Sequence, residues 1–169
     1  GFAIDDMKEA KAFIATGEAK DGAYVRRYIM KDGSGKTNPL PNADVLSPET
    51  EPDNTVPLIK FEREGASDVA IVSFSVHPCT CAGKRITADF IHFVRLTLEQ
   101  ALSDVADGRG CKVAYFSGAL GDGVAKNYFV FRPKKSFIYL CFNDEFINKN
   151  IRQKCLSTKN HSKRTPSMA

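Results

Sequence analysis

The clearest pattern in the chain is an apolar run that stops at a histidine. Residues 69–76 read VAIVSFSV and are followed directly by His77 and Pro78. A nearly continuous apolar run of this length is typical of a strand covered on both faces. Proline has no backbone N–H to donate to a ladder, so we expect the strand to end there. The imidazole of His77 is therefore expected at the carboxyl end of a buried strand.

A helix pattern and a further strand follow. Between residues 87 and 105 the apolar positions recur with a period of 3.6, and Thr87 or Asp89 can cap the first turn. The run Cys111–Ser117 (CKVAYFS) predicts another strand, which leads into a glycine turn that contains Asp122. Strand, helix and strand with short connections predict a βαβ crossover unit. We therefore expect an α/β fold with a central mixed sheet and flanking helices.

The first third of the chain gives weaker signals. Helix-forming residues and early acids predict a short helix over 5–19, and alternation predicts strands at 24–31 and 56–62. Residues 36–57 are rich in Pro, Asn, Asp, Thr and Glu and have almost no periodicity. They predict a long loop, and a loop of this length inside a compact domain is often functional.

Composition divides the chain after Gly123. Residues 1–123 carry 14 basic and 18 acidic residues, whereas residues 124–169 carry 10 basic and 2 acidic residues and no glycine. We predict a partial α/β domain over 1–123 and a basic, aromatic-rich tail, aberrant or disordered, over 124–169. The first residues show no secretory signal and the five cysteines have no framework spacing, so a cytoplasmic location is expected.

Five short segments, at 25–33, 58–61, 72–78, 87–90 and 116–122, form a recognisable series. In their order and spacing they resemble the amino-terminal domain of the neutral/alkaline, non-lysosomal ceramidases and their small bacterial relatives. The resemblance implies a zinc-dependent amidohydrolase that cleaves an N-acyl linkage, such as that of ceramide, in a small-molecule or lipid substrate. It places His77 at the position of a zinc ligand, and Asp122 and Asp89 are the candidate catalytic carboxylates.

The chain departs from the family in two respects. The family's other zinc ligands lie in segments that have no counterpart here, so the zinc site is expected to be incomplete. In full-length ceramidases the glycine-aspartate turn also continues into a serine, whereas Asp122 is followed here by Gly123 and Val124.

The residues by themselves leave alternatives open. His77 is also compatible with a hydrogen-bonded core residue, Asp89 with a simple helix cap, and Asp122 with turn formation alone. Arg26 and Arg27 fall on opposite faces of their strand, so at most one of them can face the site.

A function of a different class also fits the sequence. The chain would then be a non-catalytic fragment or a binding module, whose basic tail contacts an anionic membrane surface or nucleic acid. The spacing of the basic residues matches no nucleic-acid module, so membrane contact ranks ahead of nucleic acid. His92 is expected in solvent, and Cys79 and Cys81 are interpreted as ordinary thiols, because no second ligand pair completes a metal knuckle.

Overall fold

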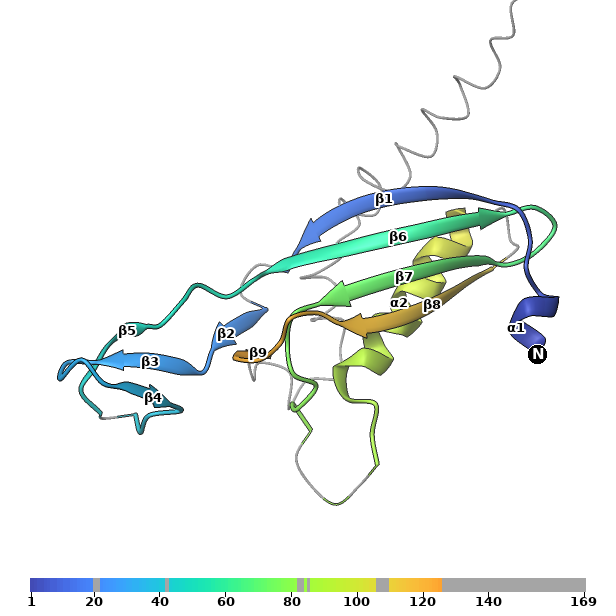
Figure 1. The fold of residues 1–169 in the computed structure, drawn as a ribbon. Coiled ribbons are helices and arrows are strands. Elements are labelled where there is room, and N and C mark those ends of the chain that lie inside the picture. The colour runs from blue at the N-terminus through green and yellow to red at the C-terminus, as the bar shows by residue number, and fades with distance from the viewer. Residues whose placement is uncertain (20–21, 42, 82–83, 85, 106–109, 126–169) are drawn as a thin grey trace, which may run out of the picture.

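The fold is taken from a computed structural model, which describes residues 1–19, 22–41, 43–81, 84, 86–105 and 110–125. The described part of the chain contains two helices, α1 (Phe2–Asp5) and α2 (Asp89–Val105), and nine strands: β1 (Ala10–Glu18), β2 (Ala23–Val25), β3 (Arg27–Met30), β4 (Gly35–Thr37), β5 (Val45–Pro48), β6 (Thr55–Arg63), β7 (Asp68–Phe74), β8 (Cys111–Ser117) and β9 (Gly123–Ala125). Figure 1 shows their arrangement.

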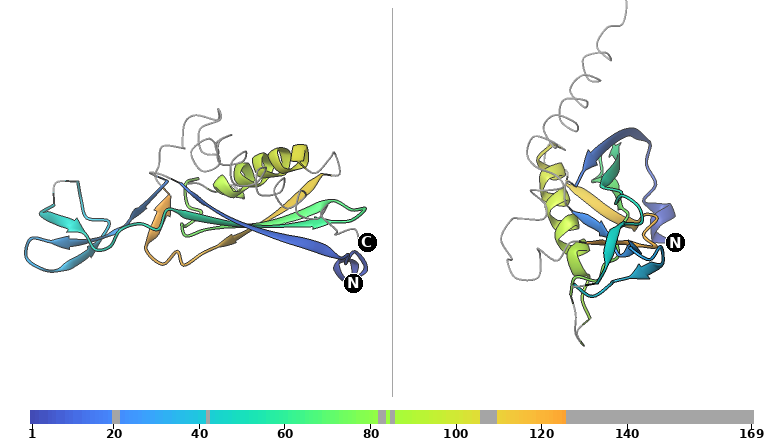
Figure 2. Two further views of the ribbon diagram at one scale, coloured as in Figure 1. Left: turned by 90° about the horizontal axis from the view of Figure 1, so that it is seen from above. Right: turned by 90° about the vertical axis from the view of Figure 1, so that its left-hand side faces the viewer.

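Four strands form the main sheet, in the order β1-β6-β7-β8. The pairs β1/β6 and β6/β7 are antiparallel, whereas β7 and β8 are parallel and joined through α2. The mixed sheet and the strand-helix-strand crossover are therefore confirmed. In Figure 2, α2 lies across one face of this sheet. It buries Phe90, Val94, Leu98 and Leu102. Phe93, another apolar residue of the helix, is exposed, and His92 is in solvent as predicted.

The expected α/β class with flanking helices is wrong. Strands dominate the described residues and form three sheets, and α2 is the one described helix longer than a single turn. The helix expected over 5–19 is mostly strand β1, which pairs with β6 along nine residues. This pairing overrides the local helix preference because it satisfies the backbone hydrogen bonds of the segment. The small residues Ala15 and Gly17 face inward.

A second departure lies in residues 24–57. The strand expected at 24–31 is two strands: β2 pairs with β9, and β3 is the centre of a separate sheet with the order β4-β3-β5. The expected loop over 36–57 contains β5, so that prediction is wrong in part. Figure 1 shows this three-stranded sheet beyond the end of the main sheet, on the side where β7 and β8 terminate.

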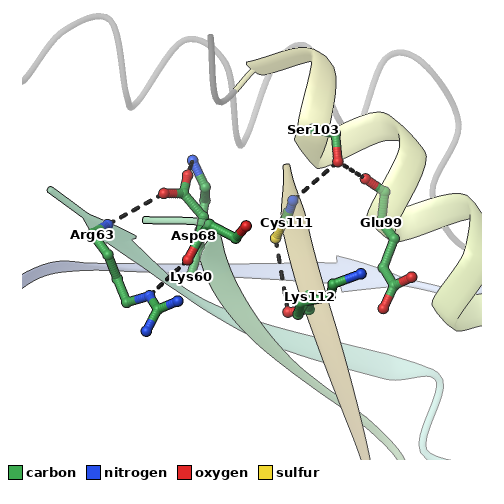
Figure 3. Close-up of polar contacts among 8 residues, drawn as sticks. Lys60, Arg63, Asp68, Glu99, Ser103, Cys111 and Lys112 are labelled. Atoms are coloured by element: carbon green, nitrogen blue, oxygen red, sulfur yellow. Dashed lines mark hydrogen bonds and ion pairs between the residues drawn. The ribbon is translucent and has the colours of Figure 1, made fainter. Parts of the chain in front are cut away.

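The core lies between α2 and the main sheet, and it includes a buried ion pair. Lys60 Nζ lies 2.8 Å from Asp68 Oδ2, and both side chains are almost fully buried. Figure 3 shows this pair at the end of the sheet where β7 and β8 begin, beside Cys111. Burial raises the pKa of the Cys111 thiol to about 11. This end of the sheet is opposite to the one that carries His77.

The boundary expected after Gly123 falls inside β9. Residues 126–169 lie outside the described residues, so the basic tail stays a prediction. No helix among the residues that the structure describes is long and apolar enough to cross a membrane.

Candidate functional site

His77 lies just beyond β7, at the carboxyl end of that strand. Its backbone is fixed by β9: it forms a parallel bridge with Val124, and its N–H donates to the carbonyl oxygen of Gly123 at 3.0 Å. Its own carbonyl accepts a hydrogen bond from the N–H of Cys79, also at 3.0 Å. Strand β7 ends at Phe74, before the proline, and the bridge to Val124 holds His77 at the carboxyl end of the sheet, where the sequence places it.

The imidazole of His77 carries an orphaned atom. Nε2 is buried and has no hydrogen-bond partner among the described residues. Buried polar atoms in folded proteins nearly always have a hydrogen-bond partner. An unpaired one has lost its hydrogen bonds to water and gained none in return, which costs free energy. An imidazole nitrogen in this state is suited to a metal ion, a substrate group or a bound water. The observation argues against His77 as a satisfied core residue.

The turn that contains Asp122 lies against the histidine backbone. Asp122 immediately precedes Gly123, whose carbonyl is the acceptor for His77. One carboxylate oxygen of Asp122, Oδ2, accepts a hydrogen bond from the hydroxyl of Thr50 at 3.4 Å. The structure therefore brings together His77 and the segment of Asp122, 45 positions apart in the sequence.

Glycine is required in this turn because the backbone approaches Ser75 closely. A Cβ atom on Gly123 would overlap the carbonyl oxygen of Ser75, and one on Gly118 would overlap its hydroxyl oxygen. The glycines of the turn, which the sequence marks clearly, therefore permit the close contact between the β8–β9 connection and the end of β7.

Asp89 acts mainly as a structural anchor. Its buried carboxylate accepts hydrogen bonds from the hydroxyl of Thr80, from the N–H of Cys81 at 2.7 Å and from the N–H of Phe90 at 2.7 Å. It thus ties the loop after Pro78 to the start of α2. Burial raises the pKa of Asp89, but these hydrogen bonds lower it more strongly, so that the pKa lies below its ordinary value. Among the described residues, no hydrogen bond of Asp89 reaches His77.

The two neighbouring arginines have different partners. The guanidinium of Arg26 donates from Nη2 to the carbonyl oxygen of Gly121 at 2.9 Å. Arg27 is exposed and forms an ion pair with Glu49, whose hydrogen bond and charge raise the pKa of Arg27. One arginine of the pair therefore reaches the turn, but the two do not alternate along one strand, because Arg26 lies between β2 and β3.

Sequence reasoning missed the contribution of residues 49–53. Thr50 contacts Asp122, and Asp53 accepts a hydrogen bond from the hydroxyl of Ser75 at 3.1 Å. This segment follows β5 and passes beside the end of β7. The polar, aperiodic character of the stretch was the available signal, but it gave no indication of which residues make the contacts.

The described residues do not complete a zinc site. A catalytic zinc ion takes three protein ligands and a water molecule. Among the described residues, no group of three or more His, Cys, Asp or Glu side chains can hold a metal ion. The orphaned Nε2 of His77 fits one ligand position, but the described residues do not supply the full set of ligands that the expected zinc centre needs.

Comparison with known proteins finds a structural similarity but no match by sequence. No family model matches the chain, and no curated protein matches it significantly. Among solved structures, the chain is similar to neutral ceramidase from Pseudomonas aeruginosa, with 18% sequence identity and a TM-score of 0.48. The match covers 88% of this chain and 21% of the ceramidase, so the chain spans about a fifth of that protein.

Proposed function

We propose that this chain is part of a zinc-dependent amidohydrolase of the ceramidase type, which hydrolyses an N-acyl amide in a small-molecule or lipid substrate. The observation that carries the proposal is the buried, unpartnered Nε2 of His77 beside the Asp122 turn. The sequence segments that resemble ceramidases place these same two residues at the site. The similarity of the overall fold is too weak to add to this argument.

The residues of the site have separate roles in this proposal. His77 offers one nitrogen ligand, and Asp122 offers a carboxylate that Thr50 orients. Asp89 contributes by position, because it holds the loop that follows Pro78. The remaining metal ligands come from outside the described residues, in this chain or in a longer protein.

Zinc binding by the intact chain tests the proposal. Bound zinc is measured by elemental analysis after dialysis, in the natural chain, in His77→Ala and in His92→Ala. His92→Ala is the matched control, because it removes an exposed histidine on α2. The proposal predicts that zinc bound by the chain is lost in His77→Ala and retained in His92→Ala, and that hydrolysis of a fluorescent N-acyl-sphingosine follows the zinc content. Zinc that survives His77→Ala, or hydrolysis that does not follow the zinc content, contradicts the proposal. If this chain alone binds no zinc, the same comparison is made on the longer protein that supplies the remaining ligands.

A second candidate is a non-catalytic fragment or binding module. It is favoured by the absence of a three-ligand metal group among the described residues. In this case the basic tail contacts an anionic membrane surface, ahead of nucleic acid. Binding to phosphatidylserine vesicles would then exceed binding to phosphatidylcholine vesicles and fall with added salt. It would survive His77→Ala and weaken when Lys134, Lys135 and Lys149 are replaced by glutamine. Equal binding to both vesicle types counts against this candidate.

A further inference from the structure

The turn at Gly121 and Asp122 is held on two sides by segments that are distant in the sequence. On one side, Arg26 donates twice: its backbone N–H to the carbonyl oxygen of Asp122 at 3.1 Å, and its Nη2 to the carbonyl oxygen of Gly121 at 2.9 Å. On the other side, the carbonyl of Gly123 accepts the N–H of His77 at 3.0 Å. The turn therefore links Arg26 to His77 through consecutive residues.

Arg26 itself has a fixed backbone. It lies between β2 and β3, and its carbonyl accepts a hydrogen bond from the N–H of Asn38 at 2.7 Å. The preceding residue, Val25, pairs with Gly123 across the β2/β9 ladder. The guanidinium therefore approaches the turn from a backbone that is held on both sides. Because the donor is charged, its bond to a carbonyl is stronger than a neutral hydrogen bond.

We infer that Arg26 is a positioning residue for the candidate site. Its guanidinium holds the Gly121 carbonyl, so that the carbonyl of Gly123 stays bonded to His77 and the carboxylate of Asp122 stays beside Thr50. Arg27, one residue away, cannot replace it, because its guanidinium is engaged with Glu49. The importance of this contact for a reaction rests on the proposed function, whereas the contact's effect on His77 does not.

Native-state hydrogen exchange of the His77 amide, measured by NMR on the full, metal-free chain, tests the inference. The variants are Arg26→Ala, Arg26→Lys and the control Arg63→Ala. Arg63 also uses its guanidinium to bond two backbone carbonyls, those of Ser67 at 2.6 Å and Asp6 at 3.0 Å, but at the opposite end of the sheet. The Leu58 amide in β6 reports global stability, so each change at His77 is expressed relative to it.

Loss of a charge-assisted hydrogen bond is expected to raise His77 exchange in Arg26→Ala by about tenfold or more beyond the change at Leu58. Arg26→Lys keeps the charge and one donor, so it restores part of the protection. Arg63→Ala is expected to change the exchange rate of the His77 amide no more than that of the Leu58 amide.

The inference is overturned if Arg26→Ala leaves the relative exchange of His77 within about twofold of the natural chain, or if Arg63→Ala raises it equally. Should Arg26→Ala not fold, Arg26→Gln, which keeps a donor without the charge, is compared with Arg26→Lys. Equal exchange of the His77 amide in these two variants and in the natural chain also overturns the inference. Since no metal is present, a failure of zinc binding leaves this result unaffected.

Discussion

The buried Lys60–Asp68 ion pair makes a strong prediction about stability. The two side chains are 2% and 0% exposed, and Asp68 Oδ1 also accepts the backbone N–H of Arg63 at 3.2 Å. Replacing Lys60 by methionine keeps a long unbranched side chain but removes the positive charge. The carboxylate of Asp68 then loses the Lys60 ammonium that pairs with it (Figure 3), while the site stays buried.

The size of the effect follows from this burial. Removing one partner of a buried ion pair typically costs about 3–5 kcal/mol, and a whole domain is stable by only about 5–15 kcal/mol. Asp68→Asn is expected to cost a similar amount, since it leaves the Lys60 ammonium uncompensated. The double variant has neither charge, so it is expected to be more stable than the sum of the single losses implies. The coupling energy should be about 2 kcal/mol or more.

Urea unfolding followed by circular dichroism measures the free energy of unfolding for these proteins. Lys31→Met is the control, because Lys31 pairs with Asp44 at 3.0 Å with both side chains exposed. Such pairs contribute little, so no measurable change in the urea midpoint is expected. A cost below about 1 kcal/mol for Lys60→Met, or strict additivity in the double variant, would refute the reasoning.

Two further predictions concern ionisation. The pKa of Asp89 is lowered on folding, since its hydrogen bonds, led by that from Thr80, outweigh the effect of burial. Its contribution to stability is therefore fully present above the unfolded value of about 3.9 and is lost as the pH falls through the folded pKa. The difference in thermal midpoint between the natural chain and Asp89→Asn should shrink on acidification, and a constant difference would contradict this. Because burial raises the pKa of Cys111 to about 11, iodoacetamide at pH 8 should modify Cys79 and Cys81 before Cys111, and peptide mass spectrometry measures this order. Equal modification of Cys111 would count against its burial.

Local patterns determined the part of the chain that carries the histidine. The apolar run ending at His77, the 3.6-residue period of α2 and the strand Cys111–Ser117 were all predictable, because the signal lies in neighbouring residues. The strand end was less well predicted, because β7 ends at Phe74, four residues before the proline that was expected to mark it. The glycines around Asp122 also identified a close backbone approach, which the contact with Ser75 explains.

Other features depend on contacts between distant residues, which only the tertiary structure decides. Strand β1 exists because β6 pairs with it, although its own sequence favours a helix, and this pairing changed the fold class. Lys60 shows no sign of burial in the sequence, because its burial depends on the partner that Asp68 provides. In the same way, the structure selects Arg26 over Arg27 for the turn beside His77, because a guanidinium can bond a carbonyl 95 residues away only after the sheets assemble.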